Sequence, residues 1–329
     1  MQTILVTGGA GFIGANFINC IRGRYQDAQI LNLDKLTYAG NLENLAPSSA
    51  DPGYRFIRGD ICDPETVTRI FQEYEVEGVF HFAAESHVDR SIRDSAAFVR
   101  TNVLGTHNLL EAARRAWSRE DGNFCPGKRF LYVSTDEVYG SLGASDPAFR
   151  EDSPYHPNNP YAASKAAGDL LVQSYIRTYG FPANITHCGN NYGPRQHSEK
   201  FLPTVIRGLL KGEEIPIYGD GENVRDWIYV EDHVNALEAV WTKGEPGETY
   251  NIGASRERRN LEMVATLIRV MEEEGIPVPE GGRLVHVEDR KAHDRRYALD
   301  TQKIQALGWR PETELEEGLK KTVEWYSRR

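Results

Sequence analysis

The chain has 329 residues, of which 40% are hydrophobic and 26% are charged, as in an ordinary globular protein with room for one large or two modest domains. Its formal net charge of −10 argues against broad binding to nucleic acid or anionic membranes, and no stretch approaches the roughly 20 apolar residues that a membrane helix requires. Four scattered cysteines, with no CxxC and no metal-ligand spacing, indicate thiols in a reducing compartment and no metal site.

The chain opens on "MQTILVTGGAGF", which has no basic segment ahead of its apolar run. We therefore expect no secretion signal and a cytoplasmic location. Short apolar runs then alternate with helix-length segments, and these runs are "TILVTG", "QILNLD", "YRFIRGD", "GVFHFAAES", "KRFLYVS" and "ANITHCGN". Near-continuous apolar strands at this spacing predict a Rossmann-like α/β fold, a doubly wound parallel sheet with helices on both faces.

Helical periodicity is plain in two segments of the first half. These are residues 98–117, "FVRTNVLGTHNLLEAARRAW", and residues 160–180, "PYAASKAAGDLLVQSYIRTYG". The second segment has Pro160 in its first turn and Gly180 after its last, which are ordinary start and stop signals for a helix.

The pattern changes beyond about residue 190. Gly and Pro become frequent, strands shorten to "IPIYG", "DWIYV" and "ETYNIG", and the helical segment 260–275 stands apart. We predict a dinucleotide-binding domain over residues 1–188 and a smaller substrate domain over 189–329. The boundary is expected to be interleaved, with allowance for strands around 228–234 to return to the first domain.

"VTGGAGFIG" follows the first strand and opens the first helix. Gly8, Gly11 and Gly14 allow a tight turn in which backbone N–H groups reach a pyrophosphate at the helix N-terminus. The second strand ends at Asp34, whose carboxylate can accept hydrogen bonds from a ribose diol and would repel a 2′-phosphate. The pattern therefore favours NAD over NADP. The alternative is a purely structural turn capped by Asp34.

Tyr161 and Lys165 form Y-x-x-x-K at the start of the second helix. Residues four apart share a helix face, so both side chains can meet one ligand. A free tyrosine titrates at about 10, which is too high for a base near neutrality. We expect the Lys165 ammonium and a positive nicotinamide ring to lower that pKa. The alternative is a pair on the helix surface.

Nine stretches, taken together, resemble the extended short-chain dehydrogenase/reductase family, whose members oxidise and reduce nucleotide sugars. They are "TGGAGFIGANF", "LDKLTYAGN", "GDICD", "FAAESHVDRSI", "STDEVYG", "PYAASKAAGD", "NNYGP", "GDGENVRDWIYVEDH" and "HDRRYALD". The resemblance extends to the dTDP-glucose 4,6-dehydratase branch of that family and runs from residue 3 to about 310. It implies a lyase that uses NAD to convert a nucleotide-activated glucose into its 4-keto-6-deoxy form.

Two adjacent acids at the end of the fifth strand suit that reaction. Oxidation at C4 makes the C5 proton acidic, and water is then lost across C5–C6 before hydride returns to C6. The resemblance implies Asp136 as the acid and Glu137 as the base, while Thr135 and Tyr161 bind the C4 oxygen. Repulsion between the Asp136 and Glu137 carboxylates helps to separate their two pKa values. The alternative is that both acids simply cap a turn.

The resemblance also implies the residues that contact each ligand. Beside the glycine loop, the expected NAD contacts are Phe12, Ile13, Asp34, Lys35, Leu36, Thr37, Asp60, Ile61, Phe82, Ala83, Ala84, Glu85, Ser86, Thr101, Tyr161, Lys165 and Asn191. The expected nucleotide-sugar contacts are Ser86, Thr135, Asp136, Glu137, Asn190, Lys200, Phe201, Pro216, Ile217, Tyr218, Arg225, Asn260, Asp289, Arg290 and His293. Lys200, Arg225 and Arg290 would supply positive charge for a diphosphate.

Three features depart from the usual pattern of the branch. Lys291-Ala292 stands where Pro-Gly is usual, Phe201 replaces an aliphatic residue, and Gly189 and His197 replace commoner residues. All of them lie on the substrate side, so the sequence leaves UDP- or CDP-glucose open as alternatives to dTDP-glucose.

Two other classes of function remain as alternatives. A 4-epimerase usually has small or hydroxyl residues in place of the acid pair, and a uronate decarboxylase tends to lack the aspartate. A non-catalytic NAD sensor has no use for a phenolate base. The resemblance further implies a homodimer in which the helices over 108–117 and 166–175 form a four-helix contact, although apolar helix faces also fit an intramolecular core.

Overall fold

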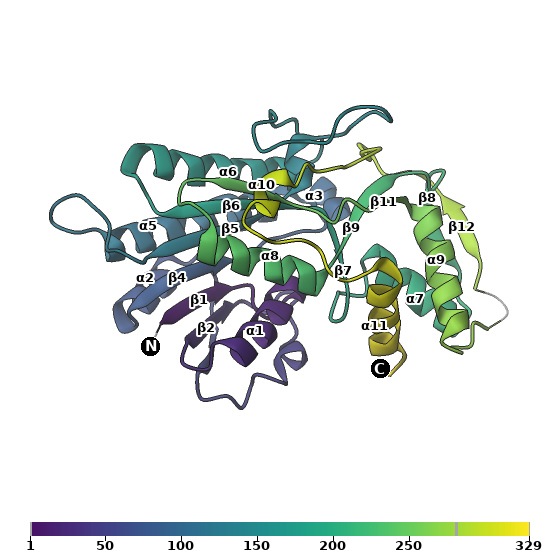
Figure 1. Ribbon diagram of the computed structural model, residues 1–329, viewed down its shortest axis with the longest axis horizontal. Helices are drawn as coiled ribbons and strands as arrows, with labels where there is room; N and C mark the ends of the chain where they lie inside the picture. Colours follow the sequence, from purple (N-terminus) through teal and green to yellow (C-terminus); the bar gives the residue numbers. More distant parts are fainter. Residues whose placement is uncertain (1, 280–281, 329) are drawn as a thin grey trace.

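The computed structural model describes residues 2–279 and 282–328. Apolar strands of the first half form one seven-stranded sheet in the order β10-β6-β5-β4-β1-β2-β3, and every pairing in it is parallel (Figure 1). The strands are β1 (Thr3–Thr7), β2 (Gln29–Asp34), β3 (Tyr54–Arg58), β4 (Val76–His81), β5 (Arg129–Thr135), β6 (Ala183–Cys188) and β10 (Thr249–Ile252). The predicted doubly wound α/β fold is confirmed.

Helices cover both faces of this sheet, because successive strand residues point to opposite sides. Ile4 and Val6 belong to the core under α1 (Phe12–Arg24), α8 (Val230–Lys243) and α10 (Gln302–Gln305), whereas Leu5 belongs to the opposite core. That second core is covered by α2 (Pro64–Glu73), α5 (Thr106–Trp117) and α6 (Pro160–Tyr179). Buried apolar strands are therefore sandwiched between two helical layers.

Short helical segments complete this part of the chain. They are η1 (Leu42–Leu45), α3 (Val88–Arg93), α4 (Ser95–Phe98), the π-helical η2 (Val99–Gly105) and η3 (Asp136–Tyr139). The expected helix over 98–117 thus begins with a π-helical stretch, and the expected strand over 78–86 ends at His81.

The rest of the chain builds smaller sheets beside the main one, on the right of Figure 1. Strands β7 (Asn190–Tyr192), β9 (Val224–Tyr229) and β11 (Glu257–Arg259) form one, and β8 (Ile215–Tyr218) pairs with β12 (Leu284–Val287) in another. Helices α7 (Phe201–Lys211), α9 (Asn260–Glu273) and α11 (Leu315–Ser327) share a third apolar core with these strands.

The chain returns to the main sheet differently from the prediction. Residues 228–234 do not form a returning strand, because β9 ends at Tyr229 and helix α8 begins at Val230. Helix α8 packs against α1, and β10 adds the outermost strand beside β6. The apolar face of α8 explains this, since Val234, Leu237 and Val240 are fully buried in the core under α1. The division at residues 188 and 189 stays a prediction.

In the described part of the chain, no helix is both long enough and apolar enough to cross a membrane.

Candidate active site

The loop between β1 and α1 is built so that backbone can approach a ligand closely. Gly8 has a φ of +72°, and a Cβ there would lie 2.6 Å from the backbone nitrogen of Ala83. A Cβ on Gly14 would collide with the carbonyl oxygen of Gly8. The loop therefore leaves a cradle without side chains at the N-terminus of α1, and this cradle fits a pyrophosphate.

Asp34 ends β2 beside this cradle. Its Oδ2 accepts a hydrogen bond from the Ala10 N–H at 2.9 Å, and its Oδ1 accepts one from the Leu36 N–H at 2.8 Å. Burial raises the pKa of this carboxyl above its ordinary value. Each carboxylate oxygen keeps a second lone pair with which to accept from a ribose hydroxyl.

A cavity of about 330 Å³ is lined by residues that follow the carboxyl ends of β1 to β6. Almost all of the predicted NAD contacts line it: Gly8, Gly11, Phe12, Ile13, Gly14, Asp34, Lys35, Thr37, Asp60, Ile61, Phe82, Ala83, Ala84, Glu85, Ser86, Thr101, Tyr161, Lys165 and Asn191. Leu36 is the exception, because its side chain packs against the core under α1. Asp60 accepts from the Cys62 N–H at 2.9 Å and forms an ion pair with Lys35 at 2.6 Å.

Tyr161 and Lys165 both face this cavity from α6, as their spacing predicts. Lys165 is buried; its Nζ donates to the Val133 carbonyl at 2.8 Å, and burial lowers the pKa of the ammonium to about 8. Burial, and after it the charge of Glu137, raises the pKa of Tyr161 well above its ordinary value. Lys165 is not among the groups that shift this pKa, so the lowering expected from Lys165 is not seen, and the lowering expected from the nicotinamide ring stays a prediction.

The two acids enter the same cavity from the end of β5. Burial raises the pKa of Asp136 well above its ordinary value, and the charge of Glu137 raises it further. Burial also raises the pKa of Glu137, while a hydrogen bond from Asn159 Nδ2 to Glu137 Oε2 (3.2 Å) and the charge of Arg225 oppose that rise. The pKa values of both carboxyls are therefore raised, and the charge of Glu137 adds to the rise of Asp136.

Hydrogen bonds fix how the acids are presented. Thr135 Oγ1 donates to Asp136 Oδ1 at 3.2 Å and accepts from the Glu137 N–H at 3.3 Å, so the threonine also caps the short η3 turn. Asp136 Oδ2 is buried and has no hydrogen-bond partner among residues 2–279 and 282–328. A buried polar atom without a partner costs stability unless a ligand satisfies it. The cap of this turn is Thr135, so the alternative in which the two acids cap it is not supported, and their catalytic roles stay a prediction.

A second cavity, of about 240 Å³, meets the first at Glu137 and Asn190, which line both. The predicted substrate contacts that line the second cavity are Glu137, Asn190, Phe201, Pro216, Ile217, Tyr218, Arg225, Asn260, Arg290 and His293. Ser86, Thr135, Asp136 and Lys200 line the first cavity instead, and Asp289 lines neither. The acid pair lies where the two cavities join.

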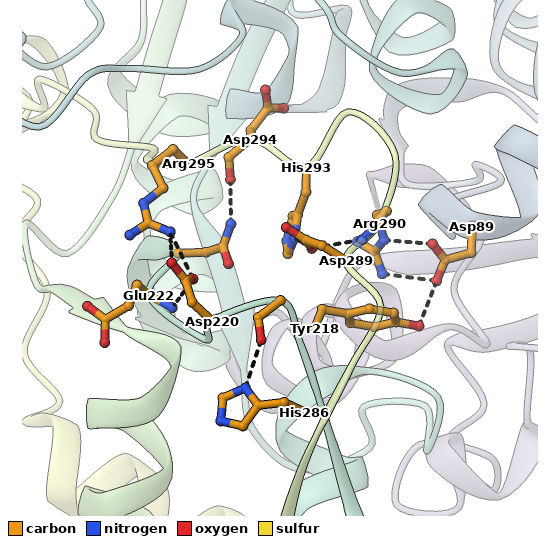
Figure 2. Close-up of polar contacts among 12 residues, drawn as sticks. Asp89, Tyr218, Asp220, Glu222, His286, Asp289, Arg290, His293, Asp294 and Arg295 are labelled. Atoms are coloured by element: carbon orange, nitrogen blue, oxygen red, sulfur yellow. Dashed lines mark hydrogen bonds and ion pairs between the residues drawn. The ribbon is translucent and has the colours of Figure 1, made fainter.

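Figure 2 shows that several polar side chains around the second cavity are already paired. Arg290 binds Asp89 with two hydrogen bonds, Nε to Oδ1 at 2.6 Å and Nη2 to Oδ2 at 3.0 Å, and its guanidinium lies 5.0 Å from the Tyr218 ring centroid. Asp289 turns toward His293, whose Nδ1 lies 2.6 Å from Asp289 Oδ1 (Figure 2). This contact explains why Asp289 does not line the cavity.

The other two predicted cations, the half-buried Lys200 and the buried Arg225, are partly engaged. Lys200 Nζ donates to the Ser86 carbonyl at 2.9 Å, and burial lowers the pKa of its ammonium. Arg225 donates to the Val224 carbonyl at 2.8 Å and the Asp294 carbonyl at 2.9 Å. Its guanidinium lies 4.4 Å from the centroid of the Tyr297 ring.

Sequence reasoning missed several residues at this junction. Asn159, which binds Glu137, could have been noticed as the polar residue just before the Tyr161 helix, and its Oδ1 also accepts from the Ala162 N–H at 2.9 Å as the helix cap. Asp89 lies in the stretch "FAAESHVDRSI" but was not named as a contact. Asp294 and Tyr297, which line the second cavity, lie in the stretch "HDRRYALD" but were not named as contacts.

The three departures from the usual pattern are placed as follows. Ala292 lines the second cavity with a φ of +52°, in the left-handed region that favours glycine. Phe201 lines the same cavity, with its ring 6.1 Å from that of Trp227 between centroids. Gly189 and His197 line the first cavity, not the second.

A parallel sheet, a glycine-rich first loop, an acid at the end of β2 and Y-x-x-x-K on α6 define a dinucleotide-dependent enzyme of the short-chain dehydrogenase/reductase type. The sequence model of the family described as GDP-mannose 4,6 dehydratase matches residues 5–322. The chain belongs to this family.

Curated relatives point to one branch of it. The chain is 49% identical to dTDP-glucose 4,6-dehydratase of Neisseria meningitidis serogroup B over 332 residues, which cover 99% of this chain and 93% of the relative. It is also 49% identical to dTDP-glucose 4,6-dehydratase 1 of Escherichia coli K12, over 98% of this chain and 92% of the relative. The predicted resemblance is confirmed.

Solved structures agree. The chain matches DesIV, a dTDP-glucose 4,6-dehydratase from Streptomyces venezuelae with NAD and TYD bound, with a TM-score of 0.90 and 45% identity, covering 100% of this chain and 98% of that one. It also matches a UDP-glucose 4-epimerase from Thermotoga maritima, with a TM-score of 0.86 and 32% identity, over 99% of both chains. Because the fold is shared with an epimerase, the site must decide the reaction.

Proposed function

We propose that this protein is an NAD-dependent lyase that converts dTDP-glucose into its 4-keto-6-deoxy derivative. One observation carries the proposal: two consecutive acids, the buried Asp136 and the half-buried Glu137, line the NAD cavity where it meets the second cavity. Burial raises the pKa of both carboxyls, and the charge of Glu137 raises that of Asp136 further, which suits Asp136 to be the member of the pair that holds a proton in an elimination. The nucleotide dTDP is assigned from the relatives reported above.

The glycine cradle, Asp34 and the Lys35–Asp60 pair would hold the adenosine diphosphate half of NAD, and Tyr161, Lys165 and Asn191 would face its nicotinamide half. Bound there, NAD supplies a hydride acceptor for C4 of the sugar and returns the hydride at C6. A dinucleotide used in this way must stay bound between the two transfers, so NAD is expected to co-purify with the protein.

Tyr161 Oη takes the proton from the C4 hydroxyl. Lys165, on the same face of α6, stabilises the phenolate, and the positive charge of the nicotinamide ring adds to this effect. Thr135, at the cavity wall beside Tyr161, hydrogen-bonds the C4 oxygen and holds it in line. The chain thereby prepares the 4-keto sugar whose C5 proton is acidic.

The acid pair then divides the elimination. Glu137 Oε1 or Oε2 removes the C5 proton while Asn159 steadies the carboxylate. Asp136, kept protonated by burial and by the neighbouring charge, donates its proton to the departing C6 hydroxyl, and water leaves. Both carboxyls therefore return to their starting states only after proton exchange with solvent or product.

The test incubates the purified protein with dTDP-, UDP- and CDP-glucose and follows each by mass spectrometry. We expect loss of one water from dTDP-glucose, and we expect Glu137→Gln to stop after C4 oxidation with the absorbance of reduced nicotinamide. Epimerisation without water loss would instead support a 4-epimerase. NAD binding without turnover of any nucleotide sugar would support an NAD sensor. If Glu137→Gln loses water at the normal rate, the assignment of the base is wrong.

We also propose the predicted homodimer, with a contact that includes 166–175 of α6 and the segment η2, which precedes the predicted 108–117. Val99, Leu104 and Leu170 are 55%, 46% and 56% exposed, and they lie on η2 and α6, which pack against each other. Exposed apolar side chains on adjoining helices are typical of a subunit interface. Sedimentation of the wild type and of Leu170→Glu tests this contact. The wild type is expected to sediment as a dimer and the variant as a monomer. A wild-type protein that sediments as a monomer would refute the contact.

A further inference from the structure

Helix α6 carries a third ionisable residue, Asp169, four positions after Lys165. Its side chain is completely buried. Oδ2 lies 3.0 Å from His187 Nε2, and Oδ1 has no hydrogen-bond partner in the described part of the chain. Burying a carboxylate with one oxygen unsatisfied is costly. A second interaction is therefore needed to account for its place in the fold.

Asp169 is held from the side away from the cavities. His187 on β6 has its Nδ1 2.7 Å from the Tyr139 hydroxyl, which donates to Asn251 Oδ1 at 2.9 Å, and the Tyr155 hydroxyl lies 3.3 Å from His187 Nε2. Among the residues that line the two cavities, none of these side chains appears. The network fixes Asp169 without giving it a contact to any ligand in either cavity.

Lys165 is the group that Asp169 faces along its own helix. Residues i and i+4 lie one turn apart on the same face, so the buried carboxylate and the buried ammonium share one face of α6. Burial lowers the pKa of Lys165, and Asp169 is the foremost charge that raises it again. Lys165 is also faced by the Tyr132 ring, 4.1 Å from its Nζ, by Cys188 on β6 and by the buried His81 on β4.

We propose that Asp169 is a positioning residue, whose carboxylate, held by His187, keeps the Lys165 ammonium charged and so sets the upper pH limit of the Tyr161 base. The inference rests on the proposed function and adds to it the residue Asp169, which lines neither cavity. Tyr161, Lys165 and Asp169 then form a single row along α6, base, cation and counter-charge, of which only the first two reach the cavity.

The decisive variant is Asp169→Asn, which keeps the shape and removes the charge. We expect the alkaline limb of kcat to move to lower pH by one unit or more, with KM for dTDP-glucose unchanged. In the protein without substrate, the ¹³Cε resonance of Lys165, identified by its absence in Lys165→Arg, is expected to titrate at a pH lower by the same amount. This resonance decides the proposal even if no nucleotide sugar is turned over.

Three further variants serve as controls. Asp232→Asn removes another buried carboxylate, which lies on α8 and accepts a hydrogen bond from the Thr313 N–H at 3.0 Å. This variant is expected to leave both titrations in place. Asp169→Glu keeps the charge and is expected to restore the alkaline limb. His187→Asn keeps the charge of Asp169 and puts an amide in place of the imidazole, so neither titration should move to lower pH by as much as in Asp169→Asn.

Two results would overturn the proposal. One is an Asp169→Asn enzyme whose kcat falls equally at every pH while the Lys165 titration stays in place, which would make Asp169 purely structural. The other is a shift to lower pH in His187→Asn or Asp169→Glu as large as that in Asp169→Asn, since these variants retain the charge.

Discussion

Replacing Gly8 by alanine tests the cofactor cradle directly. An L-residue at φ +72° costs about 1–2 kcal/mol, and forcing a methyl group into packed surroundings costs about 1–3 kcal/mol. The Cβ would lie 2.6 Å from Ala83 N and 2.7 Å from Ala83 Cα, and backbone cannot move aside as a flexible side chain would. Allowing for the stiffer unfolded chain, we expect Gly8→Ala to lower the free energy of unfolding by about 2–4 kcal/mol.

Urea unfolding with and without NAD measures this, and calorimetric titration measures NAD affinity. Because Ala83 also lines the NAD cavity, displacement of its backbone is expected to weaken NAD binding at least about tenfold, which corresponds to about 1.4 kcal/mol. Gly23→Ala is the matched control: a Cβ there meets nothing within 4 Å near the end of α1, so a gain of up to about 1 kcal/mol is expected. If Gly8→Ala matches the wild type in both stability and affinity, the argument from steric fit is refuted.

The remaining predictions concern charge. Burial raises the pKa of Glu137, and a base acts only when ionised, so the rate of water loss should fall with decreasing pH at a point above the ordinary glutamate range; an acid limb within or below that range would contradict the assignment. Burial lowers the pKa of His233 to about 3, so the folded state resists protonation of this group. As the pH falls from about 6.5 to 3, the unfolded state binds a proton that the folded state does not, and the free energy of unfolding should decrease by about 1.4 kcal/mol per pH unit from this group alone. His233→Gln should lessen that slope in urea titrations at several pH values, and an unchanged slope would count against it. Asp34→Asn removes the charge that repels a 2′-phosphate, so the ratio of NADP to NAD affinity should rise about tenfold or more in binding titrations, while an unchanged ratio would mean that Asp34 does not select the cofactor.

The parts that the sequence predicted well depend on local patterns. The glycine spacing, Asp34 and the Tyr161–Lys165 pair each follow from a turn, a strand end or a helix period, and each is found in the expected place. Helix α8 and strand β10 were not assigned to the main sheet, because short apolar segments do not show which sheet they will join. That information lies in tertiary packing.

Contacts between distant residues were also beyond the sequence. Asp89 and Arg290 are separated by 201 positions in the chain. The sequence around neither residue indicates that Asp89 binds the arginine with two hydrogen bonds before any diphosphate arrives. The same holds for Arg225, whose donors are partly used by backbone carbonyls. Predicting that basic residues gather at a cavity is easier than predicting how many of their donors remain free.

The engaged arginines and the unsatisfied acid have a common consequence for binding. Asp89 already binds the Arg290 guanidinium with two hydrogen bonds, so a diphosphate must compete with this carboxylate for the arginine. The net electrostatic attraction between Arg290 and a nucleotide sugar is therefore smaller than it would be for an unpaired arginine. Asp136 Oδ2 is in the opposite situation, because it is buried and still lacks a partner in the described part of the chain. A sugar hydroxyl placed there would form a hydrogen bond with this oxygen and so offset the cost of burying it without a partner. Binding energy at this site is therefore expected to be concentrated at the reacting end of the substrate, beside the carboxyl that must protonate it.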